Sequence, residues 1–397
     1  AHQQPFVVER QHYEPLTAAA APCGSAMERV DILRELCTYN RINTLAAVTA
    51  AQHGWLGASF SAAEILTGLY FDVARVRNPR HPEDAIVLGK GHAAPMQYAA
   101  LAGLGYFSTD ELLAYKCLDG PQAHTDIRTP GITMNTGSLG QALSKCCGLA
   151  LAKPDSHVYV ILGDGELQEG QVYEAVMTAV HYGLGNLKII VDRNGLQSDS
   201  MVSDVMGVGD TASIFEGFGL CVHTVADGND MRSVCETLRI LRDEQRPAVL
   251  IADTAKGAGI SFMSADRCPP RGYTWHGGIP TPEQYDEALE ELARHVHNSE
   301  LIREIHQYRE CRVGMLPDVS PVRSAQSIRS TGEAFAASLV RLAPGHPDLV
   351  VLDADLQKPC RLRRFAEAFP EQFLEMGIAE QDMASCAGGP ALAGKMP

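Results

Sequence analysis

Two continuous apolar runs, each followed by a polar turn, constrain the fold more than any other feature of this chain. Val158–Leu162 and Leu187–Val191 are rich in β-branched residues and do not alternate with polar ones, a pattern typical of parallel strands that are buried on both faces. Leu167–Tyr182 between them has the apolar spacing of a helix. The sequence therefore predicts a strand, a helix and a second strand, with both strands ending at one edge of the same sheet.

The turns that follow these two strands carry oxygen donors. Asp164 lies in a Gly-Asp-Gly triplet directly after the first strand, and Asn194 follows the second strand thirty residues later. Glycines allow the backbone to approach a ligand at the carboxyl ends of the strands, where open α/β sheets bind ligands. A carboxylate, an amide oxygen and a nearby backbone carbonyl suit Mg²⁺ or Ca²⁺ that bridges phosphates. The pair predicts a metal-diphosphate site.

The rest of the first 281 residues continues the alternation of helices and short strands. Helical spacing is present over Met27–Ala51 and Ser61–Phe71, and further apolar strands are expected at Ala85–Leu88, Leu220–Val225 and Ala248–Ala252. Such alternation predicts an α/β fold, a doubly wound parallel sheet with helices on both faces.

Four segments divide the chain. Residues 1–26 are polar and rich in Pro and Ala and are expected to form an extended arm, and 27–281 form the first α/β domain. Residues 282–326 are a helical linker, with prolines marking Leu316–Val322. Residues 327–397 begin a second α/β domain with helices at Thr331–Leu342 and Arg361–Phe369, strands at Leu349–Asp353 and Phe373–Ile378, and a helix from Glu380. About 70 residues with two strands are too few for a complete core, so this domain is expected to be incomplete.

Composition excludes several classes of protein. The net charge of −15 leaves no basic face for nucleic acid, and no apolar run approaches the 18 residues of a membrane span. The start of the sequence lacks the features of a secretory signal. Eleven cysteines without any Cys-x-x-Cys spacing favour reduced thiols. A cytoplasmic protein is expected.

Several histidines lie in glycine-rich loops at predicted strand ends. His92 follows Gly-Lys-Gly, His276 precedes Gly-Gly, and His53 precedes Gly-Trp-Leu-Gly. Any one of them alone is more often a packing or surface histidine. Their gathering in such loops favours a functional role, because binding residues are commonly carried by loops on a rigid scaffold.

Together these motifs resemble the transketolase family of thiamin diphosphate enzymes, whose cofactor motif is Gly-Asp-Gly followed about thirty residues later by Asn. The resemblance implies that Asp164, Asn194 and the carbonyl of Leu196 bind Mg²⁺ or Ca²⁺. Further cofactor contacts are implied for His92, Gly137, Ser138, Leu139, Gly163, Gly165, Glu166, His276, Asp355 and Glu380.

The same resemblance implies the residues that act on a substrate. Glu380, in Gly-Ile-Ala-Glu-Gln, corresponds to the acid that contacts the cofactor pyrimidine. Substrate contacts are implied for His53, His124, His276 and Arg329, and catalytic roles for Glu380, His276, His92, His124, His53, Glu169 and Glu174, the last two linking active sites across a dimer. One departure concerns His53: the family pattern is His-Pro-Gly-Gly-Ser, whereas this chain carries extra residues before Gly57-Ala-Ser59.

The resemblance implies a transferase that moves a two-carbon ketol unit from a ketose or ketose phosphate to an acceptor. Two alternatives stay open: transfer to a lipoyl or carrier-protein thiol, and 2-oxo acid decarboxylation of the deoxyxylulose-phosphate synthase or dehydrogenase type. A non-catalytic subunit is disfavoured, since Asp164, Asn194 and Glu380 are all present. Family members continue beyond the region matched here, so a second polypeptide is expected to complete the pyrimidine-binding and C-terminal domains in a two-fold heteromeric assembly.

Overall fold

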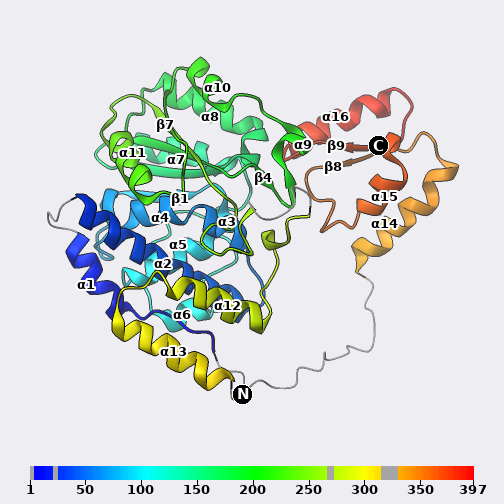
Figure 1. Ribbon diagram of the computed structural model, residues 1–397. Helices are drawn as coiled ribbons and strands as arrows, with labels where there is room; N and C mark the ends of the chain where they lie inside the picture. Colours follow the sequence, from blue (N-terminus) through cyan, green and yellow to red (C-terminus); the bar gives the residue numbers. More distant parts are fainter. Residues whose placement is uncertain (1–3, 21–25, 266–271, 314–329) are drawn as a thin grey trace. The chain divides into compact units, whose positions relative to one another are not determined.

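The chain divides into two compact units (Figure 1). The computed structural model describes residues 4–20, 26–265, 272–313 and 330–397. The first unit is Ala1–Ser200 with Gly209–Met315, and the second is Met201–Val208 with Leu316–Pro397. The predicted arm and the helices of the predicted linker thus group with the first α/β domain by their contacts, while Leu316–Val322 lies outside the described residues.

A five-stranded parallel sheet forms the centre of the first unit. Its order is β1-β2-β3-β7-β6, with bounds Ala85–Leu88, Val158–Gly163, Leu187–Arg193, Ala248–Asp253 and Cys221–Val225. The three middle strands are almost wholly buried, which explains why their sequences are continuously apolar. All five predicted strands, and the parallel α/β class, are confirmed.

Helices lie on both faces of this sheet (Figure 1). On one face, α7 (Gln141–Ala152) packs on β2 and on α8 (Gly170–His181), and α10 (Thr211–Phe218) packs on β6. On the other face, α11 (Met231–Asp243) packs on β6 and β7. The long α2 then packs on α4 and α5. The helices of the first unit are α1 (Arg10–Ala20), α2 (Ala26–Ala51), α3 (Leu56–Ser61), α4 (Ala63–Gly68), α5 (Ala94–Gly103), α6 (Thr109–Leu113), α7 (Gln141–Ala152), α8 (Gly170–His181), α10 (Thr211–Phe218), α11 (Met231–Asp243), α12 (Pro282–Ala293) and α13 (Ser299–Val313).

The prediction of an extended N-terminal arm is wrong. Residues Arg10–Ala20 form helix α1, in which His12 and Tyr13 are buried. The Tyr13 hydroxyl donates to Asn40 on α2 over 3.2 Å, and its ring lies edge-on to Tyr39. These tertiary contacts outweigh the Pro and Ala composition that favoured an extended segment.

Two predicted helices are interrupted. The expected helix over Ser61–Phe71 is instead the end of α3, then α4, then a π-helical turn at Leu69–Val73. The segment after β2 begins with a 3₁₀ turn at Gly165–Gln168 before α8 starts at Gly170. That turn brings the residues after Asp164 close to the sheet.

A buried ion pair joins α2 to α4 within the first unit. Arg41 and Glu64 are 6% and 7% exposed, and Arg41 Nη1 lies 2.8 Å from Glu64 Oε1. Arg41 Nε also donates to the carbonyl of Ala258 over 3.0 Å, and Asn229 donates to Glu64 over 2.9 Å. Because every charged oxygen and several N–H groups have partners, this pair can be tolerated in the interior.

The second unit is small. Helix α14 (Thr331–Leu342) and helix α15 (Arg363–Ala368) accompany a two-stranded parallel sheet of β8 (Val351–Asp353) and β9 (Phe373–Glu375), followed by α16 (Glu380–Leu392). Its core contains seven buried residues, among them Leu339, Val351 and Phe365. The predicted order of elements is confirmed, and the unit is a partial domain. Short elements β4 (Leu196–Gln197), β5 (Ser200–Met201) and α9 (Val202–Met206) follow β3.

No helix within the described part of the chain is long and apolar enough to cross a membrane. The described cysteines are free thiols.

Replacing Arg41 with Met tests the buried ion pair. We expect the free energy of unfolding to fall by roughly 3–5 kcal/mol, because Glu64 would remain as an uncompensated buried charge. Thermal and urea denaturation measure this loss. Arg34→Met on the same helix is the matched control: Arg34 pairs with Asp31 and Asp230 but its side chain is 48% exposed, so a loss below about 1 kcal/mol is expected. Equal losses would contradict a special role for the buried pair.

Candidate active site

Asp164 and Asn194 lie together at the carboxyl edge of the sheet. The parallel register of β2 and β3 places Gly163 opposite Asp192, so the two turns leave the sheet as neighbours. The backbone N–H of Gly195 donates to Oδ2 of Asp164 over 2.5 Å. The carboxylate of the first turn is therefore held directly against the second turn, as their spacing in the sequence predicts.

The oxygens around Asp164 fit a hard divalent cation. Burial raises the pKa of Asp164 to about 6, although the hydrogen bond from Gly195 lowers it, so a cation would stabilise the ionised form. Oδ1 of Asn194 accepts from the N–H of Leu196 over 3.1 Å, and the Leu196 carbonyl accepts from Lys256 Nζ over 3.2 Å. Each of these oxygens keeps a second lone pair, and such a donor set suits Mg²⁺ or Ca²⁺.

A buried charge network, which the sequence analysis missed, supports this edge. Lys90 and Asp192 are 1% and 0% exposed and form an ion pair. Ser61 Oγ donates to Asp192 over 2.6 Å, and the Thr254 hydroxyl donates to the other oxygen of Asp192. Asn194 Nδ2 in turn donates to Ser61 Oγ over 3.4 Å. The network thus positions Asn194, one of the three predicted metal ligands.

Three of the four histidines singled out in the sequence have ring contacts with one tryptophan, Trp55, and the fourth contacts His92. Ring centroids of His53, His92 and His124 lie 5.4, 6.4 and 4.9 Å from that of Trp55. His276 lies 5.7 Å from His92. Loops from four distant parts of the sequence therefore meet at one site, and Trp55 at its centre was not predicted.

The surroundings of three of these imidazoles favour the neutral form. Burial lowers the pKa of His92 well below its usual range, and the nearby Lys90 lowers it further. The pKa of His124 is lowered by burial and then by Lys116, and that of His53, which is exposed, is lowered in the same way. Neutral imidazoles can both donate and accept hydrogen bonds at neutral pH.

A glycine turn before α7 packs directly on the histidines. Gly137 has φ +129°, and a Cβ there would lie 2.7 Å from the His124 ring. A Cβ on Gly91 would lie 2.9 Å from the backbone nitrogen of Gly137. The turn also carries Ser138, which is exposed, and the half-buried Leu139. Only glycine permits this approach of the two loops.

The glutamates after Asp164 occupy three different environments. Glu166 is buried, and its two oxygens accept from the N–H groups of Gly140 and Gly163 over 2.9 and 3.1 Å; burial raises its pKa to about 7. Glu169 is buried at the start of α8, whereas Glu174 is exposed on that helix. Glu166 therefore fixes the backbone around the site, and the structure does not bring Glu169 and Glu174 to one face.

Glu380 lies at the first turn of α16 in the second unit and lines an apolar pocket of about 450 Å³. Phe335, Leu352 and Met383 share this lining. Asp355 has φ +58°, and its N–H donates to Glu375 over 2.9 Å. Glu380 is exposed, so its carboxyl group is accessible for the predicted contact with a heterocyclic ring. Arg329 lies outside the described residues.

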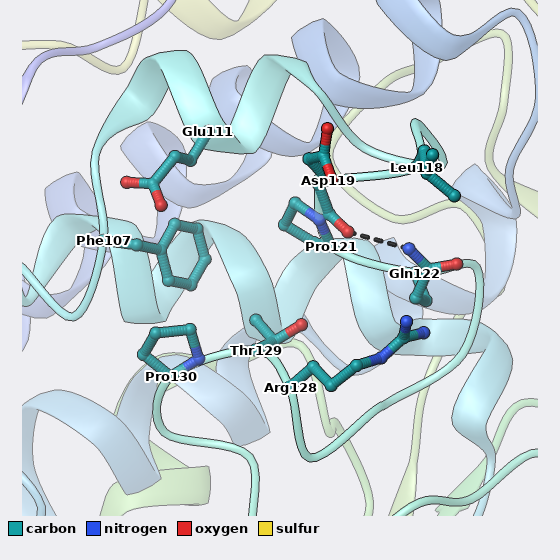
Figure 2. A pocket seen from close by; sticks show the side chains of 10 residues that line it. Phe107, Glu111, Leu118, Asp119, Pro121, Gln122, Arg128, Thr129 and Pro130 are labelled. Atoms are coloured by element: carbon teal, nitrogen blue, oxygen red, sulfur yellow. Dashed lines mark hydrogen bonds between the residues drawn. The ribbon is translucent and has the colours of Figure 1, made fainter.

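A separate pocket of about 250 Å³ lies beside α6 (Figure 2). Phe107, Pro121 and Pro130 form part of its wall, and Gln122 donates to the carbonyl of Gly120 over 2.9 Å. It contains none of the residues predicted from the sequence, so the candidate active site is the histidine and carboxylate cluster.

Comparison with known families agrees with this geometry. Residues 32–268 match the family described as transketolase, thiamine diphosphate binding domain. Residues 328–397 match the family described as transketolase, pyrimidine binding domain. The first match contains the carboxylate turns and three of the four histidines, and the second contains Glu380.

Subunits of one transketolase and a full-length transketolase are both among the relatives of this chain. One subunit of apulose-4-phosphate transketolase from Actinobacillus succinogenes is 41% identical over 60% of this chain and 87% of its own length, and the protein of the same name from Phocaeicola vulgatus is 36% identical over 68% and 98%. Human transketolase is 31% identical over 91% of this chain but only 59% of its own length. The matches to the two subunits thus cover most of each subunit but only 60% and 68% of this chain. The match to human transketolase covers most of this chain but only 59% of that protein.

Solved structures show the same fold. Transketolase from Campylobacter jejuni superposes with a TM-score of 0.59 at 23% identity, over 92% of this chain and 64% of that one. Transketolase from Leishmania mexicana gives 0.60 at 21% identity, over 87% and 60%.

Gly137→Ala tests the tight turn. The added Cβ requires an unfavourable φ and meets the His124 ring, so we expect a loss of roughly 1–3 kcal/mol in unfolding free energy, measured by denaturation. Gly148→Ala is the matched control, since Gly148 lies in α7 with no atom within 4 Å of an added Cβ; there we expect a gain of about 0.5–1 kcal/mol. A neutral Gly137→Ala variant would contradict the proposed packing.

Proposed function

The chain belongs to the transketolase family of thiamin diphosphate-dependent transferases, and we propose that it transfers a two-carbon ketol unit from a ketose phosphate to an acceptor with thiamin diphosphate and Mg²⁺ bound. The observation that carries this proposal is the meeting of Asp164, Asn194 and the histidine cluster at one edge of the sheet. Oxygen ligands for a metal-bound diphosphate and neutral imidazoles for a sugar are thereby combined in one site.

Each group has a defined task in this proposal. Bound thiamin diphosphate supplies a carbon nucleophile and an electron sink. Asp164, Asn194 and the Leu196 carbonyl hold the cation, and the glycine turn at residues 137–139 lines the cofactor. His92 and His276, whose rings lie 5.7 Å apart, move protons at the substrate oxygens. Glu380 contacts the cofactor pyrimidine.

The substrate end of the proposed site differs from the family pattern at Trp55. When Gly57 and Ser59 are matched to the His-Pro-Gly-Gly-Ser pattern of the family, Trp55 falls at the position of the histidine and His53 two residues before it. Among the described residues, no group accepts a hydrogen bond from the Trp55 indole N–H. We therefore assign to Trp55, rather than to the exposed His53, the contact with the bound sugar at this position.

Two observations support a partner polypeptide. Both apulose-4-phosphate transketolase relatives are named as one subunit of their enzyme. The second unit also exposes large apolar side chains, and Phe335, Leu342 and Leu392 are 58%, 51% and 93% exposed, which is typical of a surface that another structure covers. We propose that a second chain completes the pyrimidine-binding domain.

We also propose a cytoplasmic location, because the described cysteines are free thiols.

Tryptophan fluorescence tests cofactor binding. The chain has two tryptophans, so Trp275→Phe leaves Trp55, 6.4 Å from His92, as a single reporter. Thiamin diphosphate with Mg²⁺ should change its emission in a saturable way. Asp164→Asn should weaken this binding at least about tenfold, because loss of a ligand costs more than loss of its outer partners. Asp119→Asn, an exposed acid, is the control. Unchanged affinity in Asp164→Asn would remove that residue from the metal site.

Glu380→Gln tests the reaction in the assembled enzyme. We expect ketol transfer from a ketose phosphate to an aldehyde to fall by about 100-fold or more, as for loss of a proton-transfer group. Glu371→Gln, an exposed acid in the same unit, should leave the rate unchanged. Unaltered transfer in Glu380→Gln would contradict its role. Release of CO₂ from pyruvate without ketol transfer would instead favour the 2-oxo acid chemistry.

A further inference from the structure

Three metal-ligating side chains meet at the amino edge of the sheet, away from the candidate active site. Cys221 and His223 are two residues apart on β6 and therefore lie on the same face of that strand. Glu244 is the C-cap residue directly after α11. One ligand atom from each of these half-buried side chains lies within 4.8 Å of the others.

The spacing of these atoms matches a transition-metal site. Cys221 Sγ lies 3.6 Å from His223 Nε2. A tetrahedral Zn²⁺ with bonds of about 2.3 Å to sulfur and about 2.0 Å to nitrogen places those two atoms about 3.5 Å apart. A thiolate, an imidazole and a carboxylate form a donor set that favours zinc over Mg²⁺ or Ca²⁺.

Backbone contacts hold the cluster in place. The Cys221 N–H donates to the Pro247 carbonyl over 2.9 Å, and Lys188 Nζ donates to the Glu244 carbonyl over 2.5 Å. A cation already lies among the donors, since the Arg246 guanidinium donates to Cys221 Sγ over 3.0 Å and to Glu244 over 2.7 Å. The Arg246 side chain is 69% exposed, so it can leave for solvent when an ion binds.

We propose that Cys221, His223 and Glu244 form a zinc site with a water as fourth ligand, which ties the start of β6 to the end of α11. On binding, the thiol proton passes to solvent and the carboxylate exchanges Arg246 for the metal. The registers of β6 with β7 and of β7 with β3 place Cys221 level with Lys188, which lies about 13 Å from Asp192 along the strand. The site is independent of the proposed ketol transfer.

Titration with Co²⁺ and Zn²⁺ tests this site. The full chain carrying Asp164→Asn is used, because this change removes the oxygen-rich metal site from the measurement. We expect one Co²⁺ per chain with a thiolate charge-transfer band in the near ultraviolet, displaced by one Zn²⁺. Absence of that band, or of stoichiometric Zn²⁺ binding by calorimetry, would overturn the proposal.

Variants assign the ligands. Cys221→Ser and His223→Gln should each weaken Zn²⁺ binding by at least about 100-fold, and Cys221→Ser should abolish the charge-transfer band. Cys311→Ser, an exposed thiol on α13, is the matched control and should keep both. Far-ultraviolet circular dichroism of the metal-free variants verifies that they fold. Equal affinity in Cys221→Ser and Cys311→Ser would contradict the site.

Arg246→Gln gives a test with the opposite sign. Because this guanidinium competes with the metal for the same donors, its removal should tighten Zn²⁺ binding by at least about threefold. A merely structural cluster held together by Arg246 would instead lose order, and weaker or unchanged Zn²⁺ affinity in Arg246→Gln would overturn the competition that the proposal requires.

Discussion

The buried pair of Lys90 and Asp192 is the contact on which the candidate active site depends. Lys90 lies in the loop after β1, and Asp192 lies near the end of β3. Ser61 at the end of α3 and Thr254 in the turn after β7 donate the other hydrogen bonds to Asp192. A buried charge without such partners would be strongly destabilising. Fully paired, it fixes the positions of the loops that carry His92 and Asn194.

The sequence predicted the parts of this structure that follow from local patterns. Buried parallel strands read as continuous apolar runs, and glycine and polar turns mark their ends, so the strands and the neighbourhood of Asp164 and Asn194 could be foreseen. Helix α1 could not, because it is stabilised by contacts of Tyr13 with residues on α2. Nor could the ion pair of Lys90 and Asp192, since these residues are 102 positions apart in the sequence and leave no local signal.

At Trp55 the chain carries an indole where the family pattern has a histidine. The histidine nearest the family pattern, His53, is exposed, and the tryptophan two residues later contacts three histidine rings instead. An indole offers one N–H donor and a large apolar face, whereas an imidazole can donate and accept. In the proposed function, a sugar beside Trp55 would therefore present an acceptor oxygen and a C–H face at this point, rather than a hydroxyl that needs an acceptor.

Asp164 links the stability of the fold to pH. Since burial raises its pKa to about 6 from an ordinary value near 4, the folded chain binds this proton more tightly than the unfolded chain does. Ionisation of Asp164 therefore lowers stability as the pH rises from about 4 to about 6. A divalent cation favours the ionised carboxylate, so it restores that stability above about pH 6 and competes with the proton below it. Burial of the Asp164 carboxylate would thus favour the binding of a cation at this edge of the sheet.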